Sequence, residues 1–276
     1  MSDTAPTIGM VAGEASGDLL GAHLIAALRS HLPRTTFIGI GGPKMQAEGL
    51  SSLFPMERLA VRGYAEVLRH YPGLVWMRRK LRLALLEARP QLFIGVDAPD
   101  FNLGLEAGLK RAGVPVVHYV SPSIWAWRGG RIAAIARSVD HVLTLFPFEP
   151  AIFSKAGVAA SYVGHPLADL IPEQDQTAGA RDQLKIAPES KVIALLPGSR
   201  QSELRYMADT FIATAKLLAQ KIEQPLFLVP LVSRETREMF EAALYRSGAD
   251  SLNLTILFGH AREALAAADV ALVASG

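Results

Sequence analysis

An arginine placed directly after a Pro-Gly-Ser turn is the first pattern in this chain that can do chemistry. In LLPGSRQSE, residues 195–203, an apolar run ends at Gly198, Ser199 is placed as an N-cap, and a helix begins near Arg200. The amides and positive dipole end of a helix favour an anion, and a guanidinium matches paired phosphate oxygens. We expect a phosphate site here, although a capped helix whose arginine meets solvent or a carboxylate fits the same residues.

A second turn follows the first apolar run, in VAGEASGDLLGAHL, residues 11–24. Ser16 and Asp18 are placed to cap the helix that comes next. Glu14 and Asp18 would repel a diphosphate, and the glycine spacing does not fit G-x-G-x-x-G. Glu14 therefore suits the hydroxyl groups of an uncharged ring, or else it serves the dipole of its own helix.

Asp97 ends an apolar strand in LFIGVDAPDFNL, residues 92–103. Open α/β sheets build their ligand crevices at the carboxyl ends of their strands, so this carboxylate is a candidate general base. Asp100 precedes a helical segment. It is placed as an N-cap, with a role in the site as the alternative.

Aromatic and hydroxyl side chains gather at the end of another strand, in HYVSPSIWAWR, residues 118–128. Ser121 and Trp125 suit stacking and hydrogen bonding to a sugar, or packing under a loop. A lone buried histidine is more often structural, and this is our interpretation of His118. No histidine and carboxylate cluster has the spacing of metal ligands, so we predict no metal.

The segment 61–86 combines apolar and aromatic residues with a basic cluster. Such a combination suits contact with an anionic bilayer surface, whereas two helices with a solvated basic face are the plainer interpretation. The residues that would make the contact are Trp76, Arg78, Arg79, Lys80 and Arg82.

Composition excludes several classes of protein. The 276 residues are 50% hydrophobic with a formal charge of only +2, which fits a packed globular protein and argues against nucleic acid as a partner. The chain has no cysteine, so disulfides and thiolate metal sites are excluded. The N-terminus lacks the features of a signal peptide, and no apolar run is long enough to span a membrane. We expect a cytoplasmic protein.

Apolar runs alternate with segments of helical periodicity, the pattern of a parallel α/β sheet. We predict two doubly wound domains, residues 1–168 and 169–276, joined through a polar stretch within 167–190. Strands are expected at 7–12, 36–40, 92–97, 115–120, 141–146, 160–164, 191–196, 226–232, 254–258 and 270–274. Helices are expected at 16–31, 58–70, 74–88, 101–112, 130–138, 148–156, 200–221, 234–247 and 261–268.

Six segments together, VAGEASGDLLGAHL, GVDAPDFNL, HYVSPSIWAWR, LFPFEP, VGHPLAD and LLPGSRQSE, closely resemble the lipid-A-disaccharide synthase family over essentially the whole chain. The resemblance implies a GT-B glycosyltransferase with two doubly wound domains facing across a cleft. It implies transfer of the glucosaminyl group of UDP-2,3-diacylglucosamine to 2,3-diacylglucosamine 1-phosphate, with inversion and release of UDP. No cofactor or metal is expected for this reaction.

The resemblance also implies roles for the residues above. Asp97 would deprotonate the acceptor 6-hydroxyl, and Arg200 with Gly198, Ser199 and Glu203 would bind the diphosphate of the donor. The acceptor side would be positioned by Glu14, Ser16, Asp100, Ser121 and Trp125. Segment 61–86 would contact the cytoplasmic face of the inner membrane, and the full-length protein would form a homodimer.

The chain stops directly after an apolar strand, whereas members of this family continue with further helices. We therefore expect a fragment whose second domain is incomplete, which binds UDP weakly and has little or no activity by itself. Two alternatives stay open: another GT-B enzyme such as a UDP-N-acetylglucosamine 2-epimerase, and a non-catalytic membrane-surface module. An NAD-dependent oxidoreductase is disfavoured by the missing glycine signature and the acidic first loop.

Overall fold

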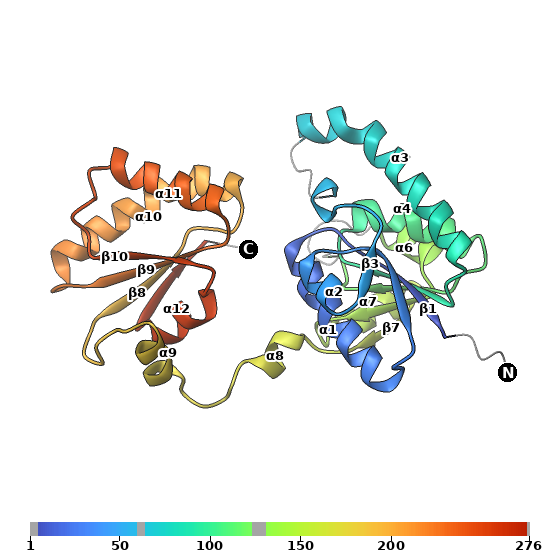
Figure 1. Ribbon diagram of the computed structural model, residues 1–276, viewed down its shortest axis with the longest axis horizontal. Coiled ribbons are helices and arrows are strands. Elements are labelled where there is room, and N and C mark those ends of the chain that lie inside the picture. Colours follow the sequence, from blue (N-terminus) through green and yellow to red (C-terminus); the bar gives the residue numbers. More distant parts are fainter. Residues whose placement is uncertain (1–4, 60–63, 123–130, 275–276) are drawn as a thin grey trace. The chain divides into compact units, whose positions relative to one another are not determined.

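The computed structural model describes residues 5–59, 64–122 and 131–274. The chain folds into two compact units, Met1–Leu170 and Ile171–Gly276, each built on its own parallel sheet (Figure 1). Buried apolar clusters lie on both faces of each sheet. Each unit therefore has a core of its own, as a domain requires.

Within the described residues, the sheet of the first unit has seven parallel strands in the order β3-β2-β1-β4-β5-β6-β7. The central strand β1 reads TIGMVA and is buried almost throughout, as expected for a strand that is covered on both faces. The strands are β1 (Thr7–Ala12), β2 (Thr36–Ile40), β3 (Leu50–Ser52), β4 (Leu92–Val96), β5 (Val116–Tyr119), β6 (His141–Thr144) and β7 (Ala159–Tyr162).

Helices cover both faces of this sheet. Buried residues of α3, α4, α6 and α7 join one apolar cluster, and those of α1 and α2 join the cluster on the opposite face. The helical segments are α1 (Ala15–His31), α2 (Pro43–Ala47), the short 3-10 turn η1 (Met56–Arg58), α3 (Tyr64–Ala88), α4 (Pro99–Lys110), α6 (Arg131–Ser138), α7 (Glu149–Ser154) and α8 (Pro166–Leu170).

Helix α3 corrects one prediction. The Pro72-Gly73 pair favoured a break between two helices, but a single helix runs from Tyr64 to Ala88. Proline removes one backbone hydrogen bond and does not forbid the turns that follow it. Those later turns are fixed by packing, because Met77, Leu81 and Leu85 recur at every fourth residue and are buried against the sheet.

The strand order of the first sheet reverses between β1 and β4. In doubly wound sheets the ligand crevice forms at this point, outside the carboxyl ends of the two strands. The loops after β1 and β4 approach closely, since a Cβ atom built on Gly13 would lie 2.8 Å from the Cβ atom of Ala98. The topology therefore brings the predicted residues Glu14 and Asp97 to one edge of the sheet.

The second unit repeats the plan on a smaller scale. Its four described strands are parallel in the order β10-β9-β8-β11, so its strand order reverses between β8 and β11. Helices α10 and α11 contribute to the apolar cluster on one face, and α9 and α12 to that on the other. The elements are α9 (Thr177–Gln183), β8 (Val192–Leu196), α10 (Gln201–Lys221), β9 (Leu226–Leu231), α11 (Arg234–Arg246), β10 (Leu254–Phe258), α12 (Ala261–Ala267) and β11 (Val270–Val273).

The polar stretch 167–190, part of which was expected to link the two domains, contains α9. Arg181 of this helix is buried and donates hydrogen bonds to the carbonyl groups of Ala267 and Pro188. It also pairs with Asp269 at 2.9 Å. These contacts fix α9 to the second unit.

Candidate functional site

Asp97 lies directly after β4 at the point where the first sheet reverses its strand order. Its side chain is half-buried, and its backbone adopts φ 50°, followed by φ 45° at Ala98. Left-handed conformations are unfavourable for residues with a Cβ atom, and two in succession persist only where neighbouring contacts hold them. The backbone N–H of Asp97 donates to the carbonyl of Tyr119 at 2.9 Å, which ties the turn to β5.

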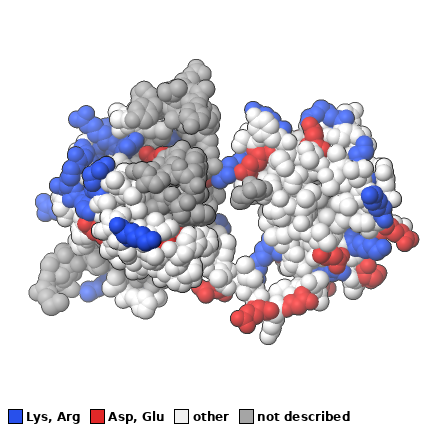
Figure 2. Space-filling view, turned by 180° about the vertical axis from the view of Figure 1, so that it is seen from behind, with Lys and Arg blue, Asp and Glu red and all other residues white. Residues whose placement is uncertain are grey.

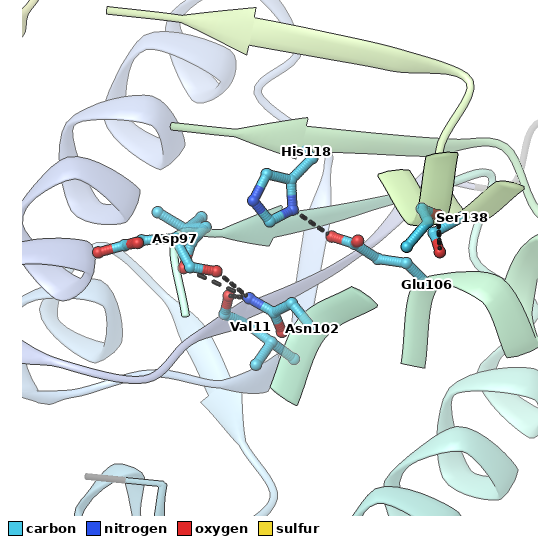
Figure 3. Close-up of polar contacts among 8 residues, drawn as sticks. Val11, Asp97, Asn102, Glu106, His118 and Ser138 are labelled. Carbon is cyan, nitrogen blue, oxygen red and sulfur yellow. Dashed lines mark hydrogen bonds and ion pairs between the residues drawn. The ribbon is translucent and has the colours of Figure 1, made fainter. Parts of the chain in front are cut away.

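Asn102 holds the other side of this turn. Its side-chain amide donates to the carbonyl of Asp97 at 2.8 Å, and it lies 3.3 Å and 3.4 Å from the carbonyls of Val11 and Val96 (Figure 3). One fully buried side chain therefore connects the ends of β1 and β4. It fixes the backbone that carries the Asp97 carboxylate.

A buried ion pair lies beside this turn. His118 Nδ1 of β5 is 2.6 Å from Glu106 Oε1 of α4, and neither side chain is exposed. In Figure 3 the imidazole ring lies between Glu106 and Asp97. The second nitrogen of His118, Oε2 of Glu106 and Oδ1 of Asn102 are buried without a hydrogen-bond partner among the described residues. Such unsatisfied groups are rare in native interiors, so this cluster is unusual for simple packing.

The charges of this cluster favour a protonated histidine. Burial alone would lower the pKa of His118. The Glu106 carboxylate opposes burial through its charge and its hydrogen bond, and the Asp97 carboxylate acts in the same direction. The pKa of His118 is therefore raised above its ordinary value.

Gly95 makes room for the ion pair. It pairs with His118 across β4 and β5, and a Cβ atom at this position would lie 2.0 Å from Glu106 Oε1. The carboxylate of Glu106 thus occupies the space that any larger residue would fill.

The loop after β1 differs from its prediction in one respect. Asp18 is buried and accepts hydrogen bonds from the amides of Lys44 and Met45, both at 3.0 Å, so it caps α2 and not its own helix. Helix α1 begins after Glu14, which is half-buried and makes no side-chain cap, and Ser16 is exposed in the first turn. Of these two carboxylates, Glu14 lies directly after β1, at the edge shared with Asp97, whereas Asp18 serves α2.

Three further residues were predicted on the acceptor side. Asp100 is exposed in the first turn of α4, and the N-cap position that it was expected to take belongs to Ala98. Proline at the first helical position explains this, because Pro99 is suited to N1 and places the cap at Ala98, two residues before Asp100. Ser121 is half-buried and donates to the carbonyl of Pro122. Trp125 lies outside the described residues.

The turn after β8 carries the predicted phosphate site. Gly198 adopts φ 132°, and helix α10 begins at Gln201 with Arg200, not Ser199, as its N-cap. Glu203 Oε2 accepts hydrogen bonds from the amides of Ser199 and Arg200 at 2.8 Å and 3.1 Å. Its Oε1 lies 2.7 Å from Nη1 of Arg200. The helix start is therefore an anion site that the chain's own carboxylate fills.

This arrangement changes the role expected of Glu203. Burial acts to raise the pKa of Glu203, but the two amides and the Arg200 guanidinium outweigh it, and the pKa is lowered. The side chain stays ionised, so it can accept hydrogen bonds and cannot donate one to a phosphate. Glu203 caps the helix and pairs with Arg200.

The basic cluster of α3 divides into two groups. Trp76, Arg79 and Lys80 are exposed, and the Lys80 ammonium lies 5.3 Å from the centre of the Trp76 ring. Arg78 and Arg82 are half-buried against α4. Figure 2 shows lysine and arginine side chains gathered over the part of the first unit that carries this helix.

The sequence analysis did not find Asn102 or Glu106, and it interpreted His118 as structural. A signal was available, because Asn102 and Glu106 are four residues apart and so lie on one face of α4. Leu105 and Leu109 show that this face is buried. Polar residues on a buried helical face need hydrogen-bond partners. Two such residues on one face therefore indicate a buried polar cluster.

The structure describes no group of three or more potential metal ligands within residues 5–59, 64–122 and 131–274. In the same ranges, no helix is long and apolar enough to cross a membrane.

The sequence model of the family described as Lipid-A-disaccharide synthetase matches residues 8–276, nearly the whole chain. The chain belongs to the lipid-A-disaccharide synthase family. The lipid-A-disaccharide synthase of Azoarcus sp. strain BH72 is 60% identical over 272 residues, which cover 99% of this chain and 70% of the relative. That of Methylobacillus flagellatus is 58% identical over 271 residues, covering 98% and 72%. Membership makes the chain an enzyme, a hexosyltransferase of lipid A synthesis.

Solved structures of other families share the fold of this synthase family member. UDP-GlcNAc 2-epimerase from Neisseria meningitidis, bound to UDP-GlcNAc, aligns with a TM-score of 0.64 at 11% identity, covering 98% of this chain and 77% of the epimerase. The S. aureus MnaA structure with UDP aligns at 0.65 and 11%, covering 98% and 74%. At this identity the likeness concerns the fold alone, which is of the GT-B type. The epimerase alternative therefore has the fold in its favour, but the family decides against it.

Proposed function

We propose that this lipid-A-disaccharide synthase family member joins UDP-2,3-diacylglucosamine to 2,3-diacylglucosamine 1-phosphate, with Asp97 as the general base. The observation that carries the proposal is the position of Asp97, half-buried at the strand-order reversal of the first sheet on a backbone held in a strained conformation. Strained residues with fixed backbones are typical of groups whose side chains must be aimed at a reacting atom.

In the proposed reaction the Asp97 carboxylate accepts the proton of the acceptor 6-hydroxyl. The oxygen forms a bond to the anomeric carbon of the donor, while the bond from that carbon to the diphosphate breaks and its electron pair leaves with UDP. Attack from the side opposite the leaving group inverts the anomeric centre and gives a β(1→6) linkage. Glu14 lies at the same edge of the sheet and would accept hydrogen bonds from sugar hydroxyls.

Two observations support Asp97 over the other carboxylates of this edge. Asn102 and Tyr119 hold its backbone from both sides. Asp18 is occupied as the cap of α2.

Arg200 would bind the diphosphate of the donor. Charge builds on the leaving group as its bond breaks, and a guanidinium stabilises that charge through paired hydrogen bonds. UDP or UDP-GlcNAc is bound in structural neighbours of the same fold, which supports a nucleotide sugar as the donor. Glu203 occupies the turn amides, so we propose that the diphosphate displaces this carboxylate or binds beside it through Arg200.

The acyl chains of both proposed substrates would hold them in a membrane. We propose that α3 makes a peripheral contact with the cytoplasmic face of the inner membrane through exposed Trp76, Arg79 and Lys80. Aromatic and basic side chains together favour the interface of an anionic bilayer.

Mass spectrometry of the reaction products tests the proposed function. The full-length protein is incubated with both lipid substrates in detergent, and with each substrate alone. The proposal predicts a disaccharide 1-phosphate and UDP only when both lipids are present. Release of UDP with no disaccharide, or epimerisation of a UDP-sugar, would contradict it.

A further inference from the structure

A pocket of about 300 Å³ lies between α3 and α4, away from the turn that carries Asp97. Three arginines contribute to it, together with the small residue Gly104 on the opposite helix. Its lining is Val75, Arg78, Arg79, Arg82, Gly104 and Leu105.

Two glycines of α4 let the arginines lie against that helix. A Cβ atom on Gly104 would lie 2.0 Å from Nη1 of Arg78, and one on Gly108 would lie 2.8 Å from Cδ of Arg82. Gly104 and Gly108 are one helical turn apart, and so are Arg78 and Arg82. Each arginine side chain therefore lies against one of the two glycines. Arg78 is further held over the ring of Phe101, at 5.4 Å from its centre.

These cations have no anionic partner within the described part of the chain. No ion pair joins a described carboxylate to Arg78, Arg79 or Arg82, although Lys110, Arg181, Arg200, Arg234, Arg237 and Arg246 all have one. The Nε atom of Arg78 is buried and has no hydrogen-bond partner among the residues that the structure describes. Two half-buried guanidinium groups held in place without a counter-ion are a site for a ligand that brings negative charge.

The chemistry of the lining indicates which anion fits. Guanidinium forks match the oxygens of a phosphate in geometry and charge. The side chains beside the pocket on α3 are exposed and partly apolar, with Val75 at 43%, Trp76 at 53% and Leu83 at 55% exposure. An anion presented together with apolar chains suits this surface better than a free ion does.

We infer that the α3–α4 pocket binds the phosphate group of an anionic lipid. The inference extends the proposed membrane contact of α3, because it replaces diffuse attraction between a basic helix and the bilayer with one built headgroup site. The reaction proposed for Asp97 does not depend on it.

Binding to lipid vesicles tests the inference. The full chain is titrated with phosphatidylcholine vesicles that contain phosphatidic acid, and the affinity is compared between the parent and four variants. Arg78→Lys keeps the charge and loses the fork, and Gly104→Ala keeps every charge but moves Arg78. Arg78→Gln removes a charge from the pocket, and Lys80→Gln is the matched control outside it.

The pocket predicts that Gly104→Ala and Arg78→Lys each weaken binding about tenfold, the loss expected for one charge-assisted hydrogen-bonded contact. Lys80→Gln should weaken it only about fivefold, through the loss of one surface charge. Gly104→Ala should fold normally, because the atom that it displaces is the flexible end of an arginine. Thermal unfolding checks this.

Equal losses for Arg78→Gln and Lys80→Gln, with no loss for Gly104→Ala and Arg78→Lys, would overturn the pocket and leave the membrane contact intact. No vesicle binding by the parent chain would contradict both. A further experiment adds inorganic phosphate to the vesicle titration. Competition with the vesicles supports a phosphate site, whereas saturable phosphate binding without any effect on vesicle affinity would show that the ligand is a soluble phosphate and not a lipid.

Discussion

His118 Nδ1 and Glu106 Oε1 lie 2.6 Å apart, and both side chains are fully buried between β5 and α4. Attraction between buried charges is largely offset by the loss of their hydration, so the intact pair contributes little net stability. Removal of one partner is different, because the remaining charge is left without compensation.

We therefore expect Glu106→Gln to lower the free energy of unfolding by about 3–5 kcal/mol, the cost of breaking a buried ion pair. Urea denaturation of the full chain measures the change. The control is the double variant in which Glu106 and His118 are both leucine, which should recover most of the loss. A decrease below about 1 kcal/mol for Glu106→Gln would show that the pair is not ionised.

The same pair predicts a pH dependence of stability. The pKa of His118 is raised in the folded state, mainly because the effect of the Glu106 carboxylate outweighs that of burial. The folded state therefore binds the His118 proton more tightly than the unfolded state does. The resulting stabilisation is fully present below the unfolded pKa of about 6.5 and is lost as pH rises through the folded pKa. Unfolding free energies measured from pH 6 upward, against His118→Gln, should show a decline in the parent that the variant lacks. Parallel curves would contradict this.

Gly95 predicts a steric effect at the same site. Gly95→Ala would place a methyl group 2.0 Å from Glu106 Oε1, inside the buried cluster. We expect a loss of stability of about 1–3 kcal/mol, as for other overpacked cores. Gly179→Ala is the matched control, because a Cβ atom there meets nothing within 4 Å and alanine favours the helix. Equal thermal stability of the two variants would refute the proposed contact.

Glu203 and Arg200 make opposite predictions for UDP. Arg200→Gln removes a phosphate partner and should weaken UDP binding about tenfold. Glu203→Gln removes a repulsive charge and weakens the hold of this side chain on the Ser199 and Arg200 amides, so it should strengthen UDP binding several-fold, as measured by calorimetry. Weaker binding by Glu203→Gln would instead make Glu203 part of the diphosphate site.

Glu203→Gln has a second consequence, for stability in acid. The pKa of Glu203 is lowered, so its capping contribution of about 1 kcal/mol is present above its ordinary pKa and is lost as pH falls through the folded value. The Glu203→Gln variant should not lose this stability between the ordinary pKa of a glutamate and the lower pKa of Glu203 in the folded chain.

Much of the fold could be predicted from the sequence, because parallel strands covered on both faces are continuous apolar runs. The runs at 7–12, 36–40 and 254–258 have the bounds that the structure shows. Short elements escaped, since β3 and α2 have too few residues for a periodic pattern. They are fixed by tertiary contacts, such as the Asp18 cap on α2.

The site was predictable where it depends on topology and not where it depends on packing. The sequence was enough to place Asp97 at the carboxyl end of an apolar strand, where the structure has it directly after β4. Which amides a carboxylate meets depends on packing, so the expected cap of α1 by Asp18 was wrong, because Asp18 caps α2 instead. The contacts of Glu203 with the Ser199 and Arg200 amides were likewise not predicted. The His118–Glu106 contact joins a strand to a helix that precedes it. No local sequence pattern predicts that these two side chains meet.

The turnover number of Asp97→Asn in the full-length protein tests the central claim most directly. Asparagine keeps the size and the backbone contacts of Asp97 but cannot accept the proton, so we expect kcat to fall by about 10²–10⁴ with KM for both lipids largely unchanged. Exposed Asp182→Asn is the matched control and should keep the parent rate. An Asp97→Asn chain that forms the disaccharide within a factor of two of the parent rate would contradict the account.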